Sequence, residues 1–271
     1  MKRLILLLFL MGFLLSGAGT PPGDTVEAPI IMYHSLAGAG SKSTSISGAQ
    51  FEADLQYLRE HGYQAVTLGQ LADFVLHNAP LPERPVVLTF DDGYYNNYAI
   101  GLPLAQQYNM PIVVSVIGKD TEIWSEIPST DLRNGHVTWG QILEMVDSGL
   151  VEIANHTWDL HRNENGRKGA RIRPGEDVTQ YAEVLREDIG RLQGELTERV
   201  GVTPISFVYP FGATCSEATE ILREMGFLVT LSCYDGVNVL SRSDIDCLVD
   251  MRRFNRGPDR SVREILEGVG G

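Results

Sequence analysis

Cysteine is scarce in this sequence, with only three among 271 residues, at positions 215, 233 and 247. An odd number permits at most one internal disulfide, and none of the three has the CxxC spacing of a structural zinc site. A Cys233–Cys247 bridge remains open, without further support from the sequence. The chain is long enough to bury a full hydrophobic core, so we expect it to fold without disulfide bonds.

Positively charged residues are also few, since the sequence has 22 Lys and Arg against 35 Asp and Glu, and its formal net charge is −13. This balance argues against sequence-independent nucleic-acid binding, which needs clustered cations. The sequence contains neither the GxxxxGK pattern of a phosphate loop nor the GxSxG pattern of a serine-hydrolase elbow. Internal repeats and low-complexity tracts are absent as well, which excludes repeat arrays.

One long apolar run exists, Leu4–Leu15, which follows two cations and precedes small residues. Its length of about twelve residues is short of the roughly 20 that span a bilayer as a helix, and this layout is typical of a secretory signal. We therefore predict a signal peptide over 1–18, a Pro- and Gly-rich linker over 19–28 and one domain over 29–271. The protein is expected to be secreted or extracytoplasmic at the cell surface, with an uncleaved membrane anchor as the alternative.

The rest of the chain alternates short β-rich runs with amphipathic helical segments. Helical periodicity predicts a helix from Phe51 that ends at Gly62, a second before Gly149 and a long third over Tyr181–Val200. Such alternation implies βαβ units, so we predict a single α/β domain that is a distorted (β/α) barrel of seven or eight parallel strands. A doubly wound open sheet is the alternative. The predicted strands are Ile30–His34, Gln64–Thr67, Val86–Phe90, Ile112–Ile117, Val151–Ala154, Ile205–Tyr209, Leu228–Leu231 and Leu248–Arg252.

Side chains that could bind a metal or take part in catalysis directly follow two of these strands. Asp91 and Asp92 come after Val86–Phe90, and neighbours on an extended chain point in different directions, so one can bind a metal while the other faces substrate. A solvated Asp-Gly turn is the alternative. His156 and His161 follow another strand and are five residues apart, which excludes the helical HExxH arrangement but allows a strand end and a loop to converge. One Asp and two His leave open positions on a cation, as in catalytic metal sites.

Two further strands end in residues of interest. His34 ends Ile30–His34, and the run Tyr209-Pro210-Phe211-Gly212 closes another strand. The carboxyl ends of parallel strands form the active-site rim of a (β/α) barrel, so these residues are expected to meet there. The polar segment 161–178 is unusually long for a loop in a compact domain, which often marks a functional loop.

Three motifs together resemble the polysaccharide deacetylase family, also described as the NodB-homology or carbohydrate esterase family 4 group. They are TFDDG at 89–93, NHTWDLH at 155–161 and YPFG at 209–212. The resemblance implies a distorted (β/α) barrel and a metal-dependent deacetylase in which Asp91 is the base. It also implies one divalent metal ion, with zinc expected, whose protein ligands are Asp92, His156 and His161. The five-residue histidine spacing is similar to the poly-N-acetylglucosamine deacetylase branch.

The third motif departs from the family pattern RxPYG. Val208 stands in place of the Arg that normally orients the base, and Phe211 in place of the Tyr. Arg252 or Arg253 is a candidate replacement for that Arg. Phe211 retains a backbone N–H that can contribute to an oxyanion hole, because this role needs no hydroxyl.

The family's catalytic acid, a His in an LxxH motif near the C-terminus, has no counterpart after His161. The run Ile31-Met32-Tyr33-His34 matches its shape at the other end of the chain. The resemblance to the poly-N-acetylglucosamine branch, in which this element is circularly permuted, therefore implies that His34 is the general acid.

The sequence thus predicts a secreted, monomeric hydrolase that removes N-acetyl groups from an N-acetylglucosamine-containing cell-wall polysaccharide or exopolysaccharide and releases acetate. Partners other than this substrate are not expected, neither nucleic acid nor, if the signal is cleaved, a lasting membrane contact. The alternatives are a non-catalytic glycan-binding relative and another barrel metallohydrolase such as a phosphoesterase. A phosphoesterase with a two-metal site would require more metal ligands. The candidate substrate-binding residues are Tyr94, Trp158, Tyr209, Pro210 and Arg253.

Overall fold

The computed structural model describes residues 24–38 and 44–268. The signal peptide predicted over 1–18 lies outside these residues. Among the described residues, no helix is both long and apolar enough to cross a membrane. The described cysteines Cys215, Cys233 and Cys247 are all free thiols, so the structure contains no Cys233–Cys247 bridge.

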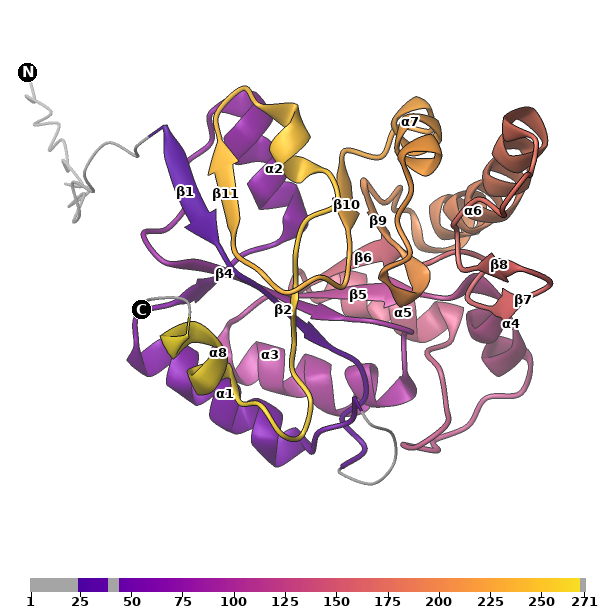
Figure 1. Cartoon of the computed structure of the whole chain (residues 1–271). Coiled ribbons are helices and arrows are strands. Elements are labelled where there is room, and N and C mark those ends of the chain that lie inside the picture. The colour runs from indigo at the N-terminus through magenta and orange to yellow at the C-terminus, as the bar shows by residue number, and fades with distance from the viewer. Residues whose placement is uncertain (1–23, 39–43, 269–271) are drawn as a thin grey trace, which may run out of the picture.

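The centre of the molecule is a curled parallel sheet, which confirms the predicted barrel-like α/β domain (Figure 1). Its strands run in the order β10-β9-β6-β5-β4-β2-β12, and β3 pairs with β4 beside this path. All of these pairings are parallel. The strands are β2 (Ile30–Tyr33), β3 (Gln64–Ala65), β4 (Pro85–Phe90), β5 (Ile112–Val116), β6 (Val151–Asn155), β9 (Ser206–Val208), β10 (Val229–Leu231) and β12 (Phe254–Asn255).

Helices connect the strands, and several begin at a side-chain cap that the sequence supplies. Ser47, Thr67 and Thr138 each form a capping box with a Gln three residues later, which satisfies amide groups at the helix start. The helices are α1 (Gly48–Glu60), α2 (Leu68–His77), α3 (Leu102–Tyr108), α4 (Gly118–Glu126), α5 (Trp139–Asp147), α6 (Val178–Val200), α7 (Ser216–Glu224) and α8 (Val262–Glu267), with a π-helix at Asn97–Gly101 and 3-10 turns at Pro210–Gly212 and Ile245–Leu248.

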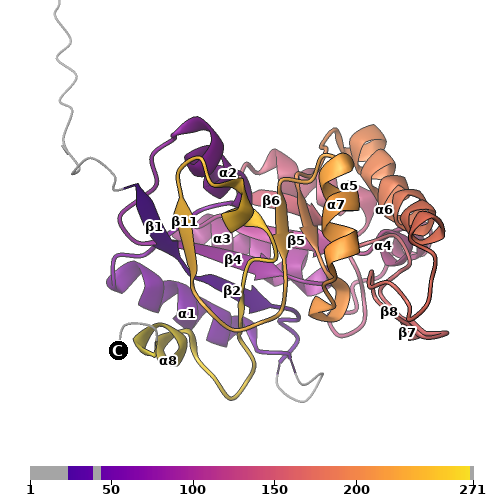
Figure 2. The ribbon, with the colours of Figure 1, turned by 45° about the horizontal axis from the view of Figure 1, so that its top comes forward.

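The core follows from the alternation of side chains along the strands. Phe90 and Val114 point to one face of the sheet and pack with residues of α1, α3, α5 and α8. Val87 and Val113 point to the other face and pack with residues of α2. Figures 1 and 2 show α1, α3 and α8 together at one end of the strand order, with α6 and α7 near its other end, and Leu192 and Leu196 of α6 pack in the same cluster as Phe90. Both faces of the sheet are therefore covered, and its C-terminal edge is left for the site.

Two short antiparallel pairs lie outside this sheet. Strand β1 (Thr25–Ala28) pairs with β11 (Asn238–Ser241), so the predicted linker over 19–28 is shorter than expected at its C-terminal end. The Pro and Gly signals stop at position 23, and a four-residue strand shows too little alternation to reveal itself. Strands β7 (Asn163–Glu164) and β8 (Arg167–Lys168) form a hairpin inside the long polar segment 161–178.

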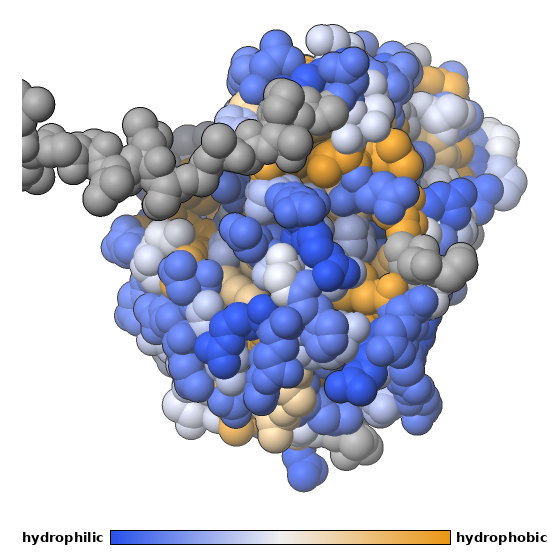
Figure 3. Space-filling view, turned by 90° about the vertical axis from the view of Figure 1, so that its left-hand side faces the viewer, coloured by the Kyte–Doolittle hydropathy of each residue, from blue (hydrophilic) through white to orange (hydrophobic). Residues whose placement is uncertain are grey.

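The segment around residues 248–255 completes the barrel in an irregular way. The strand predicted over Leu248–Arg252 is wrong, because this stretch makes a single bridge, from Met251 to Leu231, and regular pairing with β2 begins only at Phe254. The segment thus contacts β10, at one end of the strand order, and β2, near the other end, and it carries Arg253 between them. Figure 3 shows a flank where polar side chains cover most of the surface and hydrophobic ones emerge in patches.

Candidate active site

Three side chains converge at the C-terminal ends of β4 and β6. The Nε2 atoms of His156 and His161 lie 3.6 and 3.4 Å from Asp92 Oδ1. Asp92 and Thr157, which sit just beyond the strand ends, both have left-handed backbone, with φ of 72° and 74°. Such backbone is unusual for residues other than glycine and clusters at functional sites, where the surrounding structure holds it in place.

This cluster fits a metal ion. Asp92 Oδ1 is buried and has no hydrogen-bond partner among the described residues, although a buried carboxylate oxygen ordinarily requires one. The Nδ1 of His156 lies 2.7 Å from the carbonyl of Val208, so Nδ1 carries the proton and the Nε2 lone pair faces Asp92. Ligands about 2.1 Å from a tetrahedral zinc ion lie about 3.4 Å apart, close to the observed spacing.

The protonation states of His161 and Asp92 also favour binding of a cation. Burial, followed by the neighbouring His156, lowers the pKa of His161 to about 4, so its ring is neutral at pH 7. Burial acts to raise the pKa of Asp92, but the three surrounding histidines outweigh it and hold that pKa far below its usual range. A neutral imidazole and an ionised carboxylate are the forms that bind metals.

Asp91 is held beside this cluster by a buried ion pair. Arg253 Nη1 and Nη2 lie 2.7 and 2.8 Å from the two carboxylate oxygens of Asp91, and Ser115 Oγ donates to Oδ1 at 3.0 Å. Burial acts to raise the pKa of Asp91, but the Arg253 guanidinium outweighs it and holds the pKa at about 2. Asp91 is therefore ionised and fixed in orientation at neutral pH.

The structure decides between the two candidate arginines. Arg253 is fully buried and donates through Nε to the Ser232 carbonyl at 2.7 Å as well as to Asp91. Arg252 instead donates to the carbonyl of Asp235 at 3.1 Å, on the exposed side of the segment. Arg253 thus occupies the position expected for the missing Arg of the third motif. It orients Asp91 and is fully buried, so its assignment as a substrate-binding residue is corrected.

His34 lies next to Asp91 because β2 and β4 are neighbours in register. Tyr33 is opposite Phe90, and the Asp91 amide donates to the Tyr33 carbonyl at 3.0 Å. The charge of a protonated His34 acts on both Asp91 and Asp92. Its Nδ1 is buried without a hydrogen-bond partner among the described residues. The structure therefore brings the predicted general acid to the same site.

Phe211 reaches the site from the turn after β9. Its backbone is left-handed at φ 59°, and its ring packs on His161 with centroids 4.5 Å apart. The two hydrogen bonds of this turn run from the Gly212 amide to the Tyr209 carbonyl and from the Ala213 amide to the Pro210 carbonyl. Neither of them uses the Phe211 amide, which is the donor expected for an oxyanion.

The other candidate substrate-binding residues are buried. Tyr209 is fully buried against Phe207, and Pro210 is buried in the turn, so neither ring is available to stack on a sugar. Trp158 packs under α4, where a Cβ on Gly118 would meet it at 2.4 Å. Tyr94 is also buried, and its hydroxyl interacts with Asp92, which together with burial raises its pKa well above the usual value.

Sequence reasoning missed several residues that support the site. Ser115 appears in the sequence only as one polar residue within the apolar strand β5, yet it donates to Asp91. Asn97 Nδ2 donates to the His34 carbonyl at 2.8 Å, and His136 Nδ1 lies 2.9 Å from the Asp92 carbonyl. No local signal identifies these residues, because each acts on a segment that is distant in the chain.

Fold and site together define a (β/α)-barrel protein with an Asp/His/His cluster that could hold a metal ion and a second, arginine-paired carboxylate. The family model for polysaccharide deacetylase matches residues 78–230, more than half of the chain. The chain therefore belongs to the polysaccharide deacetylase family.

Named relatives refine this likeness. The chain is 30% identical over 224 residues to poly-β-1,6-N-acetyl-D-glucosamine N-deacetylase of Escherichia coli, a match that covers 76% of the chain and 33% of the relative. The chain thus spans about a third of that relative's length. Among solved structures, a de-N-acetylase from Aggregatibacter actinomycetemcomitans matches with a TM-score of 0.75, 26% identity and coverage of 89% and 99% of the two chains. IcaB from Ammonifex degensii matches with a TM-score of 0.72, 27% identity and coverage of 86% and 93%.

Proposed function

We propose that the protein is a metal-dependent deacetylase that hydrolyses N-acetyl groups of a poly-N-acetylglucosamine polymer. The observation that carries the proposal is the convergence of Asp92, His156 and His161 beside the Asp91–Arg253 pair. The activity for which the Escherichia coli relative is named supports the same choice of substrate. An exopolysaccharide is favoured over peptidoglycan on this ground alone.

The residues divide the work of amide hydrolysis. A divalent ion, with zinc expected, supplies a Lewis acid for the acetamide carbonyl when bound by Asp92 and the two histidines. Asp91 accepts a proton from the attacking water, because it is ionised and oriented by Arg253. The Phe211 amide donates a hydrogen bond to the carbonyl oxygen as negative charge develops there.

His34 completes the reaction on the leaving group. The oxygen of water bonds to the acetyl carbon, the carbon–nitrogen bond breaks, and His34 donates the proton that the departing amine needs. Acetate and a free amino sugar are the products.

Export of the protein is part of the proposal. The signal-like pattern over residues 1–18 supports a substrate outside the cytoplasm. Expression in a bacterial host with an intact export pathway, followed by N-terminal sequencing of the extracellular fraction, tests it. A mature chain that begins just after Ala18 is expected, whereas an intact N-terminus in the membrane fraction indicates the anchor.

Metal content tests the central claim. The wild-type chain and Asp92→Ala are purified without added metal, offered zinc, and analysed by mass spectrometry for bound ions. About one ion per wild-type chain and a loss in the variant are expected, with Asp159→Ala as a control that removes a carboxylate outside the ligand cluster. Acetate release is then compared on poly-β-1,6-N-acetylglucosamine, chitin oligomers and peptidoglycan. Absence of metal from the wild type even with zinc offered would favour a glycan-binding function instead.

A further inference from the structure

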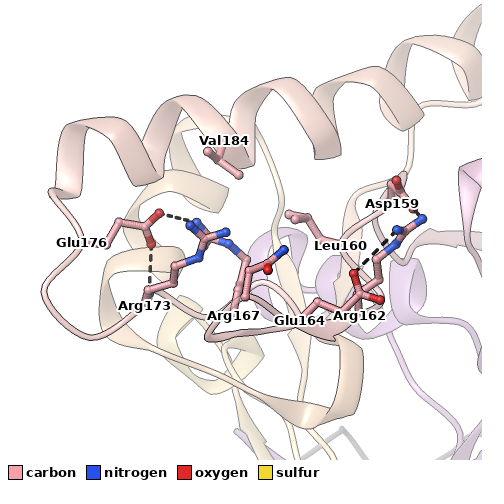
Figure 4. A pocket seen from close by; sticks show the side chains of 9 residues that line it. Asp159, Leu160, Arg162, Glu164, Arg167, Arg173, Glu176 and Val184 are labelled. Atoms are coloured by element: carbon pink, nitrogen blue, oxygen red, sulfur yellow. Dashed lines mark hydrogen bonds and ion pairs between the residues drawn. The ribbon is translucent and has the colours of Figure 1, made fainter.

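Two cavities whose lining includes many charged side chains extend from the metal-binding cluster toward the β7–β8 hairpin. The first, of about 190 Å³, is lined by His161 together with residues of the α4 start, among them Lys119 and Asp120. The second, of about 280 Å³, lies under the hairpin and is lined by Arg167 and Glu176 among others (Figure 4). Asp159 and Arg162 line both cavities, so the two adjoin at this pair. We call the two cavities together the hairpin groove.

The floor of the hairpin groove is built from buried contacts. Arg167 and Glu176 form an ion pair whose side chains are only 6% and 11% exposed. The amides of Gly118 and Lys119 donate to the carbonyls of Thr157 and Trp158 at 3.1 and 2.9 Å, which fixes α4 against the histidine loop. The shape of the groove is therefore set by the fold, and its rim is formed by more exposed side chains.

The rim carries both positively and negatively charged side chains that can form hydrogen bonds. Asp159 accepts from Lys119 Nζ at 2.8 Å and is also paired with Arg162, and Figure 4 shows Arg162 between Asp159 and Glu164. The side chains of Lys119 and Arg162 are 42% and 44% exposed, so each retains donors that a ligand can reach.

Charges in the lining cancel, although the chain as a whole has a net charge of −13. Two cations and two carboxylates line the first cavity, and three arginines and three carboxylates line the second. A balanced lining offers no net attraction to a polycation but many donors and acceptors. This chemistry suits an uncharged ligand rich in hydroxyl and amide groups, such as sugar units that still carry their acetyl groups.

We propose that the hairpin groove binds the N-acetylated sugar units next to the unit held at the metal-binding cluster. This inference rests on the proposed function and deepens it, because it states that the enzyme recognises a polymer on the side of His161 that leads to the hairpin. Arg162 is assigned as the main specificity residue, since it lines both cavities and keeps exposed donors, whereas Asp159, which also lines both, is already paired with Lys119 and Arg162. Units that have lost their acetyl groups bring positive charge beside Arg162 and bind more weakly.

The test compares substrates of increasing length. Acetate release is measured on β-1,6-linked N-acetylglucosamine oligomers of two to six units for the wild type, Arg162→Ala and Arg186→Ala. Arg186 is a matched control because it is 48% exposed and has one carboxylate partner, Glu224, away from the groove. The wild-type to Arg162→Ala ratio of kcat/KM is expected to rise with length to about tenfold, as the loss of about 1.4 kcal/mol of binding gives. For Arg186→Ala the ratio stays near one at every length.

The other possible results distinguish failure of the groove from failure of the proposed function. A ratio for Arg162→Ala that is the same at all lengths, or equal to that of Arg186→Ala, overturns the groove while the proposed function stands. If the wild type releases acetate from none of the oligomers, the proposed function fails, and calorimetric binding of the acetylated hexamer then decides the groove. Weaker binding by Arg162→Ala than by Arg186→Ala supports it, and equal binding overturns it. Equally tight binding of the deacetylated hexamer overturns the preference for uncharged units.

Discussion

Replacing Arg253 by Met removes one partner of a buried ion pair and tests whether this pair supports the site. Arg253 is fully buried, the Asp91 side chain is 3% exposed, and two hydrogen bonds of 2.7 and 2.8 Å join them. The pKa of Asp91 falls from 3.8 to about 2 in the folded protein, which at 1.36 kcal/mol per pH unit corresponds to about 2–3 kcal/mol of stability. Without Arg253, burial is opposed only by the weaker effects of His156 and His34, so we expect a loss of about 3–5 kcal/mol in the free energy of unfolding at pH 7.

The pH dependence has a defined sign. A carboxylate with a lowered pKa contributes stability that is present above its unfolded pKa of 3.8 and is lost as the pH falls toward 2. In Arg253→Met the pKa of Asp91 is expected to rise, because burial still favours the protonated form and the strongest effect that lowers the pKa is gone. The deficit of the variant is therefore largest at neutral pH and shrinks as the pH falls toward 2.

Urea unfolding in the presence of a chelator, followed by tryptophan fluorescence, measures this effect without a contribution from bound metal. Arg252→Met is the matched control, since Arg252 is exposed, and a change within about 0.5 kcal/mol is expected. Adding Asp91→Asn to Arg253→Met should cost less than the two single changes together by about 2–3 kcal/mol. A loss below about 1 kcal/mol for Arg253→Met, or strict additivity, would refute the role of the pair.

Three further perturbations test the site and its support. His34→Gln should lower kcat by about 10²- to 10⁴-fold and leave the metal content unchanged, and either lost metal or intact turnover would contradict the acid role. Burial raises the pKa of Asp188 to about 6 although it accepts the Trp158 and Asp159 amides, so the charged form costs stability above pH 6; Asp188→Asn should flatten the fall in unfolding free energy between pH 4 and 6 in urea titrations, and an unchanged slope would argue against it. Gly118→Ala places a Cβ 2.4 Å from Trp158 and should destabilise by about 1–3 kcal/mol in thermal unfolding, whereas Gly140→Ala, with nothing closer than 3.9 Å, should not; equal effects of the two would contradict this packing argument.

Much of the fold was accessible from local pattern. Strand β4 is a run of six buried residues that leads directly into Asp91, and α6 repeats apolar positions at helical spacing over Val178–Val200. The elements that were missed are short or irregular. Strands β1 and β12 have four and two residues, too few for a periodicity to show, and their pairing depends on partners far away in the chain.

The roles of aromatic and cationic residues were less accessible. An aromatic ring near a motif is equally suited to stack on a sugar or to fill the core, and Tyr209 and Trp158 turned out to be buried. The same ambiguity applied to Arg252 and Arg253, which are adjacent in an irregular stretch. Only the position of that stretch against both β10 and β2 directs one of the two arginines inward to Asp91.

Local patterns in the chain were enough to identify Asp91, Asp92, His156 and His161 as candidate site residues, because their strand-end motifs depend only on spacing and residue type. The groups that tune these residues become visible only in the folded protein. Arg253 is 162 residues from Asp91 along the chain, and its pairing with that carboxylate exists only because the curled sheet brings the last segment beside the first strands. Local sequence patterns record which side chains a strand presents, whereas burial and charge pairing arise from contacts that form only when the whole sheet has closed.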